Sequence, residues 1–152
     1  MERIASFCVN HDKLTEGMYL SRVDGDIVTY DLRMVKPNGG IYLENAAMHT
    51  FEHLFATYAR NSDLSDKVIY VGPMGCRTGF YFLVRDLPHD QAIALVQRSM
   101  EFIVAYQDAV PGTTAVECGN YREHDLPGAR AIAQKMAGVL AGWTVAQLEY
   151  QQ

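Results

Sequence analysis

The chain has 152 residues, of which 49% are hydrophobic, 20% charged and 11% aromatic. This composition is typical of a globular protein with a hydrophobic core and excludes general disorder. The net charge is −5 and no basic stripe occurs, so we expect no nucleic-acid partner. No apolar run approaches the ~18 residues of a membrane span, and no apolar signal region follows the first residues. We therefore expect one cytoplasmic domain over residues 1–152, without a membrane partner.

The first part of the chain predicts a hairpin followed by a helix. Strands are expected over 18–23 and 26–36, joined at Asp24-Gly25. A helix is expected over 45–60, with Asn45 as its N-cap. The second strand has two faces, and the helix has an apolar stripe at i, i+3, i+4 spacing. One strand face carries Ile27, Thr29, Asp31 and Arg33, the other Val28, Tyr30, Leu32 and Met34, and the helix stripe consists of Ala47, Met48, Phe51, Leu54, Phe55 and Tyr58.

The remaining elements continue the pattern of grouped strands and helices. Two more strands are expected over 67–71 and 78–85, then a helix from Pro88 to about 107. An extended piece should reach Cys118-Gly119. A third helix should cover about 127–137, and a short fourth one should begin at Trp143. Because strands and helices do not alternate strictly, the fold class predicted is α+β, with an antiparallel sheet covered by helices on one face. The uncovered face, supplied by strands 26–36 and 78–85, is expected to be apolar and to pair in a two-fold dimer.

The strongest chemical signal is His49-Thr50-Phe51-Glu52-His53, an H-x-x-E-H motif on the predicted helix. His49 and His53 are four residues apart and project from one helical face, so both imidazoles can reach one metal ion. Glu52 leaves the helix about 100° round from His53, near such an ion and free to act as a base. The competing interpretation is a pair of histidines at the edge of the core. It is the usual one for a lone histidine, but this five-residue motif favours the metal.

A catalytic metal usually has three protein ligands, and the third can be an Asp, Glu, His or Cys. Cys118, followed by Gly119, is the best candidate because a thiolate suits Zn²⁺ or Fe²⁺, although a buried inert thiol is the more common role of such a cysteine. Cys76 lies in a glycine-bearing loop between two strands, where the neighbouring Arg77 can favour a reactive thiolate. A small hydrophobe at a strand start is the alternative for Cys76. Cys8 is expected to fill space. A polar helix turn carries His89, which we expect to be solvated.

Five groups of residues together resemble the S-ribosylhomocysteine lyase (LuxS) family over nearly the whole chain. The two most specific are His-Thr-x-Glu-His at 49–53 and Pro-Met-Gly-Cys-x-Thr-Gly at 73–79. The others stand in the same order and at similar spacing: Ser6-Phe7 with His11, Tyr30-Asp31-Leu32-Arg33 with Pro37-Asn38, and Cys118-Gly119 with His124-Asp125 and Gly128-Ala129. The chain departs from the family pattern at Asn10, at Tyr70-Val71-Gly72 and in the stretch from Gly39 to Met48.

The resemblance implies a reaction and a set of residue roles. Such enzymes cleave S-ribosylhomocysteine to homocysteine and 4,5-dihydroxy-2,3-pentanedione, the precursor of autoinducer-2 signals. They are homodimers whose two sites lie at the subunit interface. By motif, the implied roles are metal ligands for His49, His53 and Cys118, an acid/base pair for Glu52 and Cys76, and substrate contacts for Ser6, His11 and Arg33. Without the resemblance, the favoured interpretation of Arg33 is an ordinary salt bridge to a strand neighbour. The implied ion is Fe²⁺, with Zn²⁺ or Co²⁺ able to replace it, one per subunit.

Two other functions fit parts of the sequence. An H-x-x-E-H zinc metallopeptidase would use Glu52 to activate a metal-bound water, but it usually takes a carboxylate as third ligand and has no use for a loop thiol such as Cys76. A non-catalytic metal-binding module would instead have a closed site with four ligands. The lyase is the prediction that uses all the motifs.

Overall fold

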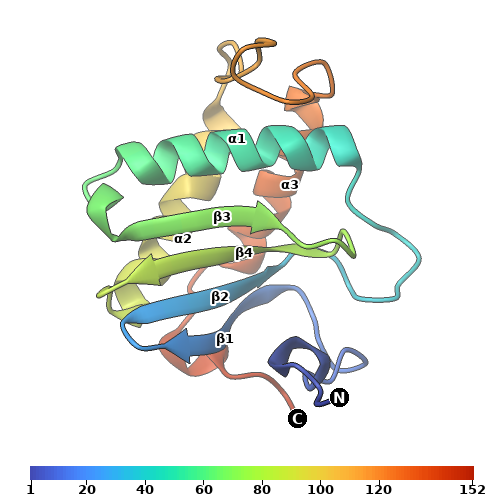
Figure 1. Cartoon of the computed structure of the whole chain (residues 1–152), viewed down its shortest axis with the longest axis vertical. Coiled ribbons are helices and arrows are strands. Elements are labelled where there is room, and N and C mark those ends of the chain that lie inside the picture. Colours follow the sequence, from blue (N-terminus) through green and yellow to red (C-terminus); the bar gives the residue numbers. More distant parts are fainter.

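The structure is a computed structural model that describes residues 1–152. One antiparallel sheet with the strand order β1-β2-β4-β3 forms its first layer (Figure 1). The strands are β1 (Gly17–Asp24), β2 (Ile27–Arg33), β3 (Val68–Pro73) and β4 (Gly79–Arg85). All four predicted strands are confirmed. β2 ends three residues early, because the N–H groups of Met34 and Val35 both donate to the Thr78 carbonyl, which interrupts the ladder.

The first hairpin turns one residue later than predicted. Asp24 is still paired, with Ile27 opposite it, so the two-residue turn is Gly25-Asp26. Gly25 has φ +64°, a conformation that glycine adopts without a steric penalty.

Three helices cover one face of the sheet, as the α+β prediction required (Figure 1). They are α1 (Asn45–Asn61), α2 (His89–Ala105) and α3 (Leu126–Val139). The cap of α3 is Asp125, whose carboxylate accepts a hydrogen bond of 3.0 Å from the Gly128 N–H. The predicted cap of α1 is wrong, since Glu44 precedes the first helical residue and makes no side-chain capping bond.

The core lies between the sheet and these helices. Tyr30 and Leu32 of β2 point toward the helices, opposite Phe82 and Phe80 of β4. All four are fully buried, and Phe51 of α1 packs against Phe80 with ring centroids 4.9 Å apart. The alternation predicted for the second strand is therefore confirmed, and the helix-facing side of the sheet is the apolar one.

The uncovered face of the sheet is more polar than predicted. Thr29, Asp31 and Arg33 alternate with the core residues of β2 and so lie on this face, with Tyr81 of β4 opposite Asp31. The expectation of an apolar uncovered face holds only in part: Ile27 and Leu83 lie on it, half-buried, but Asp31 and Arg33 make its other end polar. None of the helices is long and apolar enough to cross a membrane.

Two segments differ from the predicted elements. Residues 106–125 form successive turns above α1, where an extended piece was expected (Figure 1). Here the N–H groups of Glu117 and Cys118 both donate to the Thr114 carbonyl, which curls the chain. The predicted fourth helix is only a short 3₁₀ helix, η3 (Val145–Leu148). Two further 3₁₀ turns occur, η1 (Ala5–Phe7) and η2 (Ser65–Lys67).

Candidate active site

His49 and His53 lie on the same side of α1, as their spacing predicted. The Nδ1–H of His49 donates to the Glu123 carbonyl at 2.8 Å, and that of His53 donates to the Pro111 carbonyl at 2.9 Å. Because each Nδ1 carries the proton, each Nε2 keeps a free lone pair. Backbone carbonyls that fix the tautomer and ring orientation in this way are typical partners of metal-binding histidines.

The loop over α1 approaches His53 closely at Gly112. A Cβ atom built at this glycine would lie 3.2 Å from His53 Nδ1, and the residue has φ +71°. Both the contact and the backbone conformation favour glycine here. The Pro111-Gly112 turn thus brings the carbonyl of residue 111 within hydrogen-bonding distance of the imidazole.

Cys118 completes the expected trio. Its Sγ lies 3.4 Å from His49 Nε2 and 4.0 Å from His53 Nε2. The N–H of Asn120 donates to the same sulfur at 3.4 Å, which helps to orient the side chain. Three soft or borderline donors therefore converge from α1 and the loop after α2.

His124 joins these three donors, although it was named above only as part of the family resemblance and without a role as a ligand. The ligand atoms of His49, His53, Cys118 and His124 all lie within 4.8 Å of one another. The His124 ring stacks on that of His49 with centroids 4.0 Å apart. The available signals were its position six residues after Cys118 and its place in the His124-Asp125 pair of the family pattern.

The environment of His124 fits a metal site. Its Nδ1 lies 2.9 Å from the Thr50 hydroxyl, which also accepts a hydrogen bond from the Asp125 N–H. Its Nε2 is buried and has no hydrogen-bond partner. Burial, with smaller contributions from His49 and His53, lowers the pKa of His124. An orphaned imidazole nitrogen beside two histidines and a cysteine is a donor set that suits Zn²⁺, Fe²⁺ or Co²⁺.

Glu52 lines a cleft of about 350 Å³ next to the cluster, together with His53, Tyr70 and Gly112. The carboxylate is partly exposed, and it stands one residue from a metal-ligand candidate while remaining outside the cluster itself. This is the position predicted for a base that acts beside an ion without holding it.

The other four predicted residues meet elsewhere. Ser6, His11, Arg33 and Cys76 line one pocket of about 350 Å³ at the uncovered face of the sheet. Asp31, Tyr81 and Tyr150 also line it. The first two predicted residues come from the N-terminal segment, Arg33 from the end of β2 and Cys76 from the loop between β3 and β4.

A chain of hydrogen bonds fixes the polar groups of this pocket. Arg33 forms an ion pair with Asp31 at 2.7 Å, and the two side chains are only 4% and 2% exposed. Burial alone would lower the pKa of Arg33, but the hydrogen bonds and charge of Asp31 outweigh it and raise that pKa. Arg33 Nη1 also donates to the Thr78 hydroxyl at 2.8 Å, and that hydroxyl lies 3.0 Å from Cys76 Sγ.

Three expectations about individual residues need correction. Arg77 donates to the Leu43 carbonyl at 3.2 Å, so the cation linked to Cys76 is Arg33 through Thr78. Cys8 is exposed and fills no core space. His89 is partly buried and its Nδ1 lies 2.5 Å from the Tyr30 hydroxyl, because the first turn of α2 packs over β2.

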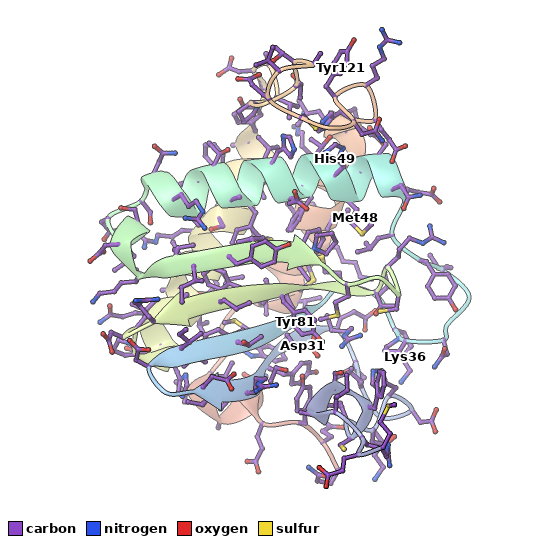
Figure 2. The ribbon with its side chains drawn as sticks, viewed as in Figure 1. Asp31, Lys36, Met48, His49, Tyr81 and Tyr121 are labelled. Carbon is purple, nitrogen blue, oxygen red and sulfur yellow. The ribbon has the colours of Figure 1, made fainter.

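The metal-ligand cluster and the pocket are separate features of one chain. Figure 2 shows His49 on α1 beneath the loop that carries Tyr121, whereas Asp31 and Tyr81 lie on the uncovered face of the sheet. The residues lining the pocket include none of the cluster and do not include Glu52. Within one chain, Glu52 therefore lies beside the metal-ligand candidates, whereas Cys76 lies in a different pocket from Glu52.

Comparison with known proteins identifies the family. A sequence model of the family described as S-Ribosylhomocysteinase (LuxS) matches residues 4–145. The chain belongs to this family. Among curated relatives, the S-ribosylhomocysteine lyase of Clostridium acetobutylicum is 41% identical over an alignment of 158 residues that covers 100% of both chains. The lyase of Clostridium beijerinckii is 44% identical over 89% of both, and that of Borreliella burgdorferi strain B31 is 39% identical over 99% of both.

Membership of the S-ribosylhomocysteinase family agrees with the cluster on α1. A group of imidazole and thiolate donors that can hold a metal is what a metal-dependent lyase requires. The metallopeptidase alternative finds no support among these relatives, which are all named S-ribosylhomocysteine lyase.

Proposed function

We propose that this chain cleaves S-ribosylhomocysteine at its carbon–sulfur bond, releasing homocysteine and 4,5-dihydroxy-2,3-pentanedione. The observation that carries the proposal is the family match over residues 4–145 combined with a preformed cluster of metal donors on α1. The dione is the precursor of autoinducer-2 signals, which places the chain in signal synthesis and in methyl-group metabolism.

In this proposal His49, His53 and Cys118 hold one ion per chain, Fe²⁺ in the cell with Zn²⁺ or Co²⁺ able to replace it. The two fixed tautomers and the N–H donated to Cys118 support the assignment. His124 adds a fourth candidate donor, since the Thr50 hydroxyl can accept from its Nδ1–H and leave Nε2 unprotonated. Four protein donors would close a tetrahedral site, whereas an ion of higher coordination number such as Fe²⁺ would still have a position open for the substrate. When bound, the ion supplies Lewis-acid chemistry at an oxygen of the sugar.

Glu52 and Cys76 are proposed as the two groups that move protons. Shifting the sugar carbonyl along the ribose requires a proton to leave one carbon and another to arrive at its neighbour. Glu52 faces the cleft beside His53, and Cys76 is exposed at the mouth of the pocket. Once the carbonyl is correctly placed relative to the thioether, β-elimination expels the thiol of homocysteine.

Ser6, His11 and Arg33 are proposed to bind the substrate. The three side chains line the same pocket as Cys76, and the His11 Nδ1–H donates to the Val9 carbonyl at 2.9 Å, which orients its ring. Arg33 uses three of its five N–H groups on Asp31 and Thr78, so two remain for hydroxyl or carboxylate oxygens of a ligand.

We call the metal-ligand cluster with Glu52 and the pocket with Cys76 the two half-sites. Because they lie apart in one chain, we propose a homodimer with active sites at its interface. In a two-fold dimer the pocket of one chain, with Cys76, faces the cluster of its partner, with Glu52, and the exchange is reciprocal. Exposed aromatic side chains border both half-sites, Phe7 at the pocket (64% exposed) and Tyr70 at the cleft (53% exposed). Burying such side chains against a second copy would add apolar contact area to that of Ile27 and Leu83 on the uncovered sheet face.

The decisive experiment incubates the purified, anaerobically metallated protein with S-ribosylhomocysteine and titrates free thiol. One equivalent of homocysteine should appear per substrate consumed. A protein that is fully metallated but releases no thiol would instead be a non-catalytic metal-binding module, and peptide hydrolysis without thiol release would make it a peptidase.

A further inference from the structure

The C-terminal tail packs beside the substrate pocket, and its aromatic residues are anchored. Trp143 Nε1 donates to the Met18 carbonyl at 3.0 Å. Tyr19 contacts Trp143 edge to face at 6.0 Å and stacks on Tyr150 with centroids 5.1 Å apart and planes at 16°. Figure 1 shows the tail ending beside the N-terminal segment that contributes to the same pocket. Tyr150 is thus held against the uncovered sheet face by a row of aromatic rings.

The hydroxyl of Tyr150 makes a specific contact there. It donates to Asp31 Oδ2 at 2.7 Å, the same oxygen that accepts from Arg33 Nη2. Arg33 then donates to Thr78, whose hydroxyl lies 3.0 Å from Cys76 Sγ. One continuous path of hydrogen bonds therefore runs from the tail to the loop thiol. The family model ends at residue 145, so Tyr150 lies outside the match.

We propose that Tyr150 is a positioning residue of the substrate pocket, acting through Asp31 to hold the guanidinium of Arg33 in its binding orientation. The inference rests on the proposed function, in which Arg33 contacts the substrate.

The physical argument concerns the freedom of the Arg33 side chain. Asp31 and Arg33 are two residues apart on the same face of β2. Both side chains are therefore anchored to the same short piece of one strand. Tyr150 adds a donor from a distant part of the chain and restrains the carboxylate from a second direction. The Asp31 carboxylate and the Thr78 hydroxyl, which accepts from Nη1, together fix the plane of the Arg33 guanidinium. The orientation of its two unused N–H groups is then fixed as well.

Tyr150→Phe tests this because it removes the hydroxyl and keeps the ring stacked on Tyr19. We expect KM for S-ribosylhomocysteine to rise about ten-fold, as for the loss of one hydrogen bond to a charged group, with kcat within two-fold of the parent. The matched control is Tyr58→Phe, since Tyr58 stacks on Phe102 of α2, outside both half-sites. It should leave KM and kcat unchanged. A chain ending at Glu149 should show at least the KM rise of Tyr150→Phe.

A second comparison separates positioning from simple packing. In an Arg33→Lys background, where the planar fork is already lost, Tyr150→Phe should change KM by less than two-fold. A lowered Tm with unchanged KM, or the same ten-fold effect in both backgrounds, would overturn the inference. The parent protein separates this outcome from failure of the proposed function: a parent that releases no homocysteine refutes the function, whereas an active parent with normal KM in Tyr150→Phe refutes only the role of Tyr150.

Discussion

The metal-ligand cluster and the substrate pocket are built in different ways. The cluster rests on one helix: His49 and His53 come from α1, and the loop after α2 adds Cys118 and fixes both rings through its carbonyls. The pocket draws on the N-terminal segment, the sheet, the β3–β4 loop and the C-terminal tail. A cluster formed by two imidazoles of one helix and a single loop above it can be preformed in one chain, whereas a pocket assembled from both termini, a strand and a loop depends on every segment that closes it.

The largest effect is expected when the sulfur donor of the metal-ligand cluster is removed. Cys118→Ala deletes the one thiolate donor, so the purified protein should retain little metal and no lyase activity. Metal per chain is measured by elemental analysis after anaerobic purification. Cys8→Ala is the control, since Cys8 is exposed and lies outside the cluster, and it should keep the parent's metal. Full metal occupancy in Cys118→Ala would exclude this residue as a ligand.

The next largest effect is expected from one substitution in each half-site. Glu52→Gln and Cys76→Ala should both keep the ion, because neither residue belongs to the cluster. Both should lose turnover by about 10²–10⁴-fold, the usual contribution of general acid–base catalysis. Homocysteine release per bound metal measures the loss. If Cys76 is only a packing residue, Cys76→Ala will have turnover within a few-fold of the parent, and the two-group mechanism will be wrong.

A smaller effect is expected at the fourth donor. His124→Gln should weaken Co²⁺ affinity by about 10–100-fold, measured by competition with a chelator and by the Co²⁺ absorption bands. Thr50→Val, which removes only the hydroxyl partner of His124, should weaken it less. His89→Gln changes an imidazole outside the cluster and should leave the affinity unchanged. An unaltered affinity in His124→Gln would limit the protein ligands to three.

The smallest effect concerns the turn that orients His53. Gly112→Ala places a side chain at φ +71° and a Cβ atom 3.2 Å from His53 Nδ1, so the free energy of unfolding should fall by about 1–2 kcal/mol. Gly138→Ala is the matched control: it lies in α3 with nothing within 4 Å of its Cβ, and the helix should gain ~0.5 kcal/mol. Thermal unfolding of the metal-free proteins compares the stability of the two variants. If Gly112→Ala is as stable as Gly138→Ala, glycine is not required at position 112.

Local signals explain what could be predicted from the sequence. The strands, the three helices and the His49/His53 pair follow from periodicity and spacing within a few residues. His124 and Tyr150 did not stand out, because their partners Thr50 and Asp31 lie 74 and 119 residues away. The polar part of the uncovered face was also missed, since alternation in β2 indicates two faces but not that Asp31 and Arg33 form an ion pair there. Grouping Ser6, His11, Arg33 and Cys76 in one role required the family resemblance, because no spacing rule joins them.

The central claim is that each active site combines the cluster of one chain with the pocket of another. Co-expressing Cys118→Ala chains with Cys76→Ala chains tests it, because each mixed dimer then holds one site with both parts intact. Random pairing makes half of the dimers mixed, so about a quarter of the parent's turnover should return although each variant alone is inactive. If each chain carries a complete site of its own, every site in the mixture is defective. A mixture as inactive as its separate components, with mixed dimers shown to be present, would contradict the account.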